Sequence, residues 1–262
     1  MISQAEPAFP KFRKYWQWRN YHYCCYIREP GKPNLADTTM KHFSAETFRF
    51  LKDLSSPRDR AWFEENRGRY EGSLLGPLRQ AVTDIGPSLR EVIKDCEIHP
   101  AVNKTITRIN RDMRFAKGQS PYKDNMLALF YREGRKRLDA QLFLGFQSEG
   151  VWRGLYVPTP LLAPDAPMAE EIENDPQAVV NLAQEIGLGA DIDLVACKKY
   201  GEIDRTLDPA KPESFLEGPH LCALQTCEPD EVAADPTAFI RETRDLLVQL
   251  APLWNLYSGD AR

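Results

Sequence analysis

The middle of the chain carries the residues best suited to chemistry, a dense run of cations. Between residues 104 and 137, ten Lys and Arg side chains stand against three Asp and Glu side chains, although the 262-residue protein has a net charge of −4. Such a surplus creates a local positive field, and arginine forks match two oxygens of a phosphate or carboxylate at once. We therefore predict an anion-binding site whose ligand-binding residues are Arg108, Arg111, Asp112, Arg114, Lys117, Tyr122 and Lys123.

The predicted roles follow from the side-chain types. Alternate residues of an extended segment share one face, which would group Arg108, Asn110, Asp112 and Arg114. Asp112 would then lie between two guanidinium groups, which it orients and which lower the pKa of its carboxyl. A carboxylate held ionised in this way is a poor proton acceptor at neutral pH. The arginines and Lys123 would contact the anion, and Tyr122 would donate a hydrogen bond or stack.

Three interpretations of this segment stay open. The favoured partner is a phosphate-bearing small molecule or nucleotide. A nucleic-acid-binding module would use the same cations together with an aromatic, basic N-terminal segment, and its affinity would fall steeply with salt. In a non-catalytic interaction domain, Arg–Asp pairs would only hold a loop against a sheet. The cluster Arg135-Lys136-Arg137 is expected to be a solvated hairpin tip.

Other chemistries find little support in the sequence. There is no Walker-type phosphate loop, no GxSxG or HExxH motif and no kinase signature. The six cysteines include no CxxC pair and the four histidines are scattered, so we predict neither a metal site nor a cofactor, and we assign no catalytic residue. Cys96 and His99 are close in sequence, but their expected role is packing.

The elements that must position the basic segment begin with helices and continue with strands. Apolar spacings of three and four predict helices near residues 44–54, 60–70 and 77–93, the last kinked or split at Gly86-Pro87. Alternating and β-branched runs predict strands at 105–109, 126–131, 141–146 and 151–157.

The remainder is predicted to be mainly helical. One or two helices are expected over residues 168–186, with an interruption at Asp175-Pro176, and a final helix over 236–257. Residues 188–235 are expected to be rich in loops, with a weak strand at 221–226. This order predicts an α+β fold, in which N-terminal helices pack on a central, mainly antiparallel sheet and C-terminal helices follow.

The N-terminal segment differs from the rest in composition. Residues 1–39 are aromatic and basic without periodicity, and we predict a poorly ordered leader or a misassigned start, because Met40 would make a natural first residue. Residues 40–262 are expected to form a single domain. The sequence has no apolar run of eighteen residues and no signal peptide, so we expect no membrane association and a cytoplasmic location.

Three blocks of the chain resemble a known family. They are residues 43–51, 59–70 and 108–123, and the last block is the most specific because it holds Arg-Asp-x-Arg-Phe and Pro-Tyr-Lys. Over residues 40–257 the chain resembles the family called domain of unknown function 2461 (DUF2461). The resemblance implies a single α+β domain, and it does not indicate which activity the protein has, because none is established for the family. Gly118-Gln119-Ser120 departs from the pattern, since relatives more often carry lysine before Pro121.

Overall fold

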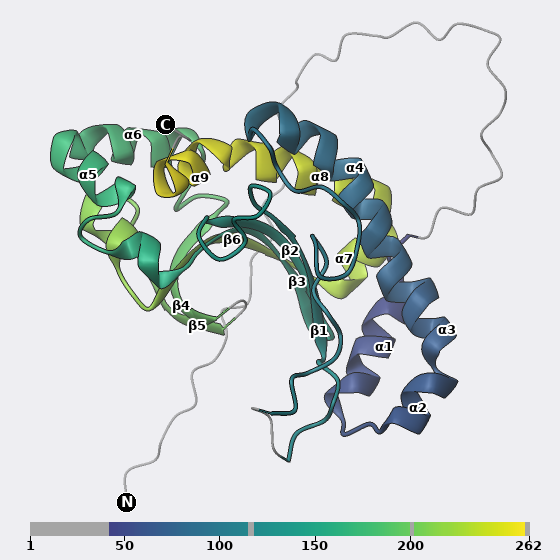
Figure 1. Ribbon diagram of the computed structural model, residues 1–262. Helices are drawn as coiled ribbons and strands as arrows, with labels where there is room; N and C mark the ends of the chain where they lie inside the picture. Colours follow the sequence, from purple (N-terminus) through teal and green to yellow (C-terminus); the bar gives the residue numbers. More distant parts are fainter. Residues whose placement is uncertain (1–41, 115–117, 200–201, 260–262) are drawn as a thin grey trace, which may run out of the picture. The chain divides into compact units, whose positions relative to one another are not determined.

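The computed structural model of this protein describes residues 42–114, 118–199 and 202–259 (Figure 1). The predictions for residues 1–39 and for Lys117 lie outside these residues. The helices and helical turns, in chain order, are α1 (Ala45–Ser55), α2 (Arg60–Glu65), α3 (Arg67–Arg69), a π-helical turn (Tyr70–Leu75), α4 (Gly76–Val92), a 3₁₀ turn (Thr159–Leu162), α5 (Pro167–Asn174), α6 (Pro176–Glu185), a 3₁₀ turn (Pro212–Leu216), α7 (Pro229–Ala234), α8 (Pro236–Gln249) and α9 (Ala251–Ser258).

The strands form one sheet in which every neighbouring pair is antiparallel. In the described part of the chain, the strands are β1 (Asn125–Phe130), β2 (Gln141–Gln147), β3 (Gly150–Val157), β4 (Asp193–Lys199), β5 (Glu202–Thr206) and β6 (His220–Cys227). Their order across the sheet is β1-β2-β3-β6-β4-β5. Helices precede this sheet and others follow it, so the predicted α+β fold is confirmed.

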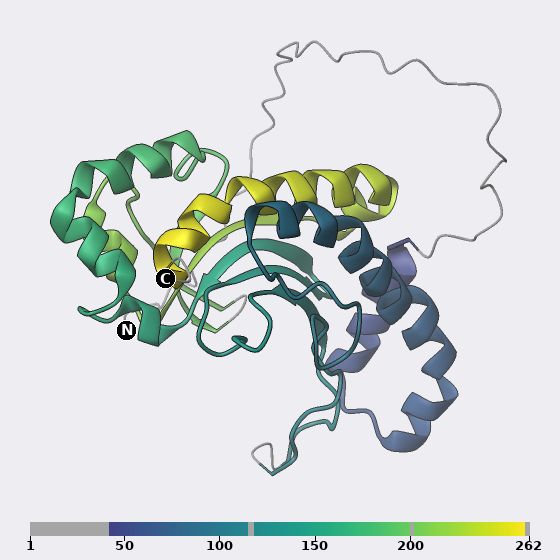
Figure 2. The same cartoon turned by 45° about the horizontal axis from the view of Figure 1, so that its top comes forward.

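Helices α4 and α8 lie side by side over one face of the sheet (Figures 1 and 2). The core lies between these helices and the sheet, and it includes the stacked rings of Phe43 and Phe146, whose centroids are 4.1 Å apart. Arg153 of β3 is buried in the same layer, where its guanidinium donates to Thr243 Oγ1 of α8 at 3.0 Å. This hydrogen bond connects the helical layer to the middle of the sheet.

The opposite face of the sheet carries a second apolar cluster. The strand register determines which residues belong to this cluster, because residues directly opposite each other on neighbouring strands share a face. The cluster consists of Leu129, Tyr131, Phe143, Tyr156, Val195, Cys197, Cys222 and Leu224. Leu127 and Trp152 pack against it and are only partly buried. The candidate site lies where this face meets the basic segment.

Two helices differ from the sequence-based expectation. Helix α4 is not split at Gly86-Pro87, although proline inside a helix costs roughly 3 kcal/mol. Ile98 Cβ lies only 2.8 Å from where a Cβ on Gly86 would be, so glycine at this position lets the helix pack closely on Ile98. The predicted final helix is divided into α8 and α9. Pro252 has no N–H to donate, so a new helix begins at Ala251.

Strand expectations were incomplete at both edges of the sheet. Residues 188–235 were expected to be loop-rich, yet they contain β4 and β5. Strand β5 is exposed along its whole length, so it shows no apolar alternation. The strand predicted at 105–109 is reduced to a short pairing with β1, in which Thr107 N–H donates to Leu127 O at 2.9 Å and Leu129 N–H donates to Thr105 O at 2.8 Å.

Candidate functional site

The basic segment folds back on itself as a narrow antiparallel pair. Arg111 N–H donates to Pro121 O at 2.7 Å, and Lys123 N–H donates to Ile109 O at 2.8 Å. These bonds flank a bridge between Asn110 and Tyr122. Because the pairing is antiparallel, Arg111 and Lys123 are brought to the same end of the sheet, next to the start of β1.

Arg111 and Lys123 line one cavity of about 360 Å³, at the lower end of the roughly 300–1,000 Å³ range of small-molecule sites. Residues of β1, β2 and β3 form the rest of its wall. The lining consists of Thr107, Arg111, Lys123, Asn125, Leu127, Phe143, Gly145, Phe146, Gln147 and Trp152. No carboxylate is among these lining residues, so the cavity has cations and amides at one end and an apolar surface at the other.

The guanidinium of Arg111 is held in place without being neutralised. Its Nε donates to Ser120 O at 3.1 Å, and its Nη2 donates to Tyr122 O at 3.4 Å. Both acceptors are uncharged carbonyls, whereas a guanidinium has five N–H donors. Within the described residues no carboxylate pairs with Arg111. The side chain therefore keeps its positive charge and has unused N–H groups that can donate hydrogen bonds to an anion.

Lys123 is half-buried beside the same guanidinium. Burial lowers the pKa of its ammonium group, and the positive charges of Arg108 and Arg111 lower it further. No ion pair of Lys123 occurs in the part of the chain that the structure describes. A lysine that is desolvated next to two other cations is in an unfavourable electrostatic environment, which a bound anion would relieve.

The other predicted site residues lie elsewhere. Arg114 pairs bidentately with Asp112, with Nε–Oδ1 and Nη2–Oδ2 distances of 3.0 and 2.7 Å, and this hydrogen bonding lowers the pKa of the Asp112 carboxyl. Neither residue lines the cavity. Tyr122 is buried and stacks on Phe63 with ring centroids 4.2 Å apart. Arg108 is exposed and lies outside the cavity, and its positive charge helps to lower the pKa of Lys123.

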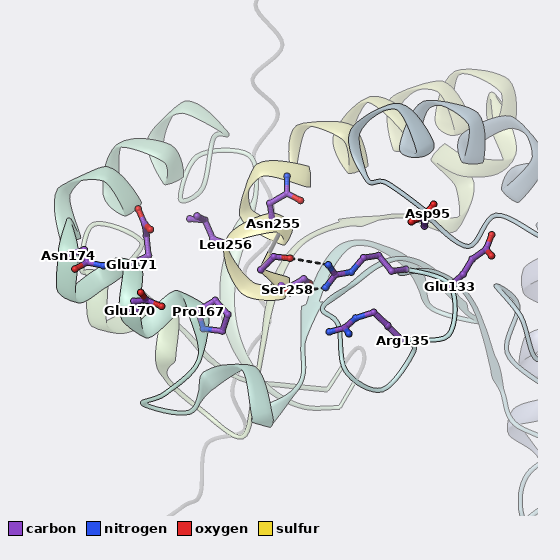
Figure 3. Close-up of a pocket in the computed structure, with 12 residues that line it drawn as sticks. Asp95, Glu133, Arg135, Pro167, Glu170, Glu171, Asn174, Asn255, Leu256 and Ser258 are labelled. Atoms are coloured by element: carbon purple, nitrogen blue, oxygen red, sulfur yellow. Dashed lines mark hydrogen bonds between the residues drawn. The ribbon is translucent and has the colours of Figure 1, made fainter. Parts of the chain in front are cut away.

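A second, larger cavity of about 850 Å³ lies between the β1–β2 connection and helices α5 and α9 (Figure 3). Its wall includes Arg132 and Arg135, but also four carboxylates, those of Asp95, Glu133, Glu170 and Glu171. These acidic side chains would repel an anion. The wall therefore suits the predicted chemistry less well than the smaller cavity does, despite its greater volume.

The arginines of this larger cavity have a structural role. Arg132 donates to the buried carboxylate of Asp139 through Nε and Nη2, both at 2.8 Å, and to Ser258 O and Gly259 O at 2.8 and 3.0 Å. Arg135 Nε donates to Asp139 Oδ1 at 2.8 Å. Arg135 was expected at a solvated hairpin tip; it is exposed in the β1–β2 connection, and its guanidinium also helps to hold that connection on the buried carboxylate.

Sequence reasoning missed the residues that complete the smaller cavity. Asn125 and Gln147 are directly opposite each other on β1 and β2, and Gly145 is opposite Trp152 on β3. None of them belongs to a recognisable motif. A weak signal was available, because Asn125 and Gln147 are polar residues that flank two predicted strands on the side nearest the basic segment.

Comparison with known proteins places the chain in a family. Residues 46–255 match the sequence model of a family described as conserved hypothetical protein (DUF2461). The chain belongs to the DUF2461 family. The predicted resemblance is thereby confirmed, and the match of this DUF2461 protein includes the basic segment and the six described strands. No curated protein matches the sequence.

The described residues also bear on two other expectations. Among them, no group of three or more His, Cys, Asp or Glu side chains is arranged to hold a metal ion. No helix within them has the length and apolarity needed to cross a membrane. The cavity of this DUF2461 protein therefore has Arg111 and Lys123 at one end, next to an uncharged wall.

Proposed function

We propose that this DUF2461 protein binds a phosphate-bearing small molecule in the cavity lined by Arg111 and Lys123. One observation carries the proposal, which is that two cations line one cavity of suitable size and that its described lining residues include no carboxylate. Phosphate oxygens would accept hydrogen bonds from the unused N–H groups of Arg111 and from the ammonium group of Lys123. Charge-assisted hydrogen bonds of this kind contribute about 1.5–3 kcal/mol each.

The distribution of ion pairs favours a small anion over a nucleic acid. Several cations of the basic segment are already paired with carboxylates, as in Arg114–Asp112, Lys104–Glu97 and Arg132–Asp139. A nucleic acid would need a continuous track of available cations along its phosphates. Arg111 and Lys123 instead converge on one cavity.

Isothermal titration calorimetry with inorganic pyrophosphate tests the proposal. We expect the full-length chain to bind pyrophosphate. Arg111→Ala should weaken binding by about 10- to 150-fold, which corresponds to the loss of one charge-assisted hydrogen bond. Lys123→Met should weaken it similarly, and the ammonium of Lys123 makes no hydrogen bond among the described residues that this change would remove.

Arg114→Ala is the matched control, because this arginine lies three residues from Arg111 but pairs with Asp112 outside the cavity. Its affinity for pyrophosphate should equal that of the wild type. The proposal is wrong if the wild type does not bind pyrophosphate, or if Arg114→Ala weakens binding as much as Arg111→Ala. A steep salt dependence of binding to single-stranded oligonucleotides, with no pyrophosphate binding, would favour the nucleic-acid interpretation.

A further inference from the structure

The apolar end of the cavity contains a slot formed by a glycine. Leu127, Gly145 and Trp152 are opposite one another on β1, β2 and β3, so they form one row across the sheet. All three line the cavity. Where a Cβ on Gly145 would be, Leu127 Cγ lies 3.3 Å away and the nearest atom of Trp152 is its carbonyl oxygen at 3.8 Å. The Leu127 side chain therefore closes one side of the slot over Gly145, and the slot opens toward Trp152.

The adjacent row holds two side-chain amides. Asn125 and Gln147 are paired across β1 and β2, one two-residue step from the glycine row, which is about 7 Å along a strand. Within the described residues, neither amide has a hydrogen-bond partner. Each amide offers both donors and an acceptor. Together they can bind a ligand edge on which N–H and C=O groups alternate.

The cavity thus has three parts in a consistent order. The slot beside Trp152 comes first, the amides of Asn125 and Gln147 come next, and the cations Arg111 and Lys123 lie at the end nearest the basic segment. A flat ring fits a slot that has an indole at one side, because aromatic rings stack on tryptophan. A phosphate alone would occupy only the cationic end and leave the slot and the amides unused.

We infer that the ligand is a nucleotide, a planar nitrogen heterocycle joined to a phosphate group. The heterocycle lies in the slot over Gly145 and stacks on Trp152, its polar edge bonds to Asn125 and Gln147, and its phosphates bind Arg111 and Lys123. This inference rests on the proposed function, since it assigns the cationic end to phosphate. It adds the class of the ligand and four residues that recognise its base.

The test compares ligands that contain different parts of a nucleotide. Calorimetry on the full-length chain would use inorganic pyrophosphate, the nucleoside diphosphates ADP, GDP, CDP and UDP, and the four parent nucleosides. We expect at least one nucleoside diphosphate to bind tenfold or more tightly than pyrophosphate. Stacking should also quench tryptophan fluorescence, and Trp152→Phe should remove that quenching while the protein keeps its fold.

Gly145→Val is the decisive variant, because its side chain fills the slot and touches neither cation. Valine suits a strand, and its Cβ would press on the Leu127 side chain, which must shift by a few tenths of an ångström. We expect this variant to lose the tenfold gain from the base and to keep the wild-type affinity for pyrophosphate. Arg111→Ala should leave the binding of a parent nucleoside unchanged, because a nucleoside has no phosphate for Arg111 to bind.

Each outcome separates this inference from the function on which it rests. If pyrophosphate binds and no nucleoside diphosphate binds more tightly, the inference is overturned and the phosphate-binding function stands. If nucleotides bind but Gly145→Val does not change their affinity, the base lies elsewhere and the inference is again overturned. If a nucleoside binds in a Gly145-dependent manner and pyrophosphate does not bind, the phosphate-binding function fails while the base slot is supported.

Discussion

Asp139 offers the sharpest test of how burial changes the role of an Arg–Asp pair. Its carboxylate is fully buried and accepts four hydrogen bonds, from Arg132 N, Nε and Nη2 and from Arg135 Nε, at 2.8 to 3.2 Å. Asp139→Ala removes this carboxylate and leaves the guanidinium of Arg132, which is 10% exposed, without it. Breaking a buried pair on one side costs about 3–5 kcal/mol.

That loss converts into a measurable melting shift. For a domain of about 150–250 residues, each kcal/mol changes Tm by about 2–4 °C, so Asp139→Ala should lower Tm by about 6–20 °C in thermal denaturation followed by circular dichroism. Asp112→Ala is the control, because Asp112 forms an equally short bidentate pair with Arg114, whose side chain is 81% exposed. Its Tm should match that of the wild type. Equal shifts in the two variants would refute the argument that burial, not pairing, determines the stabilisation.

Two further predictions concern Lys123 and Gly154. The folded-state pKa of Lys123 is lowered, so its charge destabilises the ligand-free fold at neutral pH, and this cost disappears as pH rises from the lowered value to the ordinary one. Lys123→Met should therefore raise Tm at pH 7, by an amount that shrinks toward pH 10.5, and a lower Tm at pH 7 would contradict this reasoning. A Cβ on Gly154 would lie 2.0 Å from Ala223 O of the neighbouring strand, so Gly154→Ala should cost about 3 kcal/mol or more in urea denaturation. Gly72→Ala, with nothing within 4 Å, provides the comparison, and similar midpoints for both variants would rule out the predicted clash.

Much of the fold could be predicted because its core elements repeat at clear periods. Strands β2 and β3 are runs of mostly apolar residues, and helix α4 has an apolar stripe, so burial is visible in the sequence. Strand β5 gave no such signal, because an exposed edge strand has no face that must be apolar. Helix α4 also continues through Pro87, and its close packing on Ile98 at Gly86 is a tertiary contact that local sequence does not specify.

The candidate site could be predicted only in part. The charge surplus pointed to Arg111 and Lys123, but it could not show that Arg114 lies outside the cavity. Which cations line the cavity depends on where the extended backbone stops. After Arg111 the chain turns, and Asp112 accepts hydrogen bonds from both the backbone N–H and the guanidinium of Arg114. The amide row of Asn125 and Gln147 depends on the register between two strands, which local sequence does not specify.

The strand order has a consequence for the growing polypeptide. Strand β6 pairs with both β3 and β4, although it is synthesised after them. Translation at about 5–20 residues per second takes on the order of 4–14 s to cover the roughly 70 residues from the end of β3 to the end of β6. During that interval the N–H and C=O groups along one side of β3 lack their native partner, as at any unprotected sheet edge. A ribosome that stalls before residue 220 would leave β3 and β4, in two separate groups of strands, without their shared partner β6, and both groups would be prone to aggregate until β6 is synthesised.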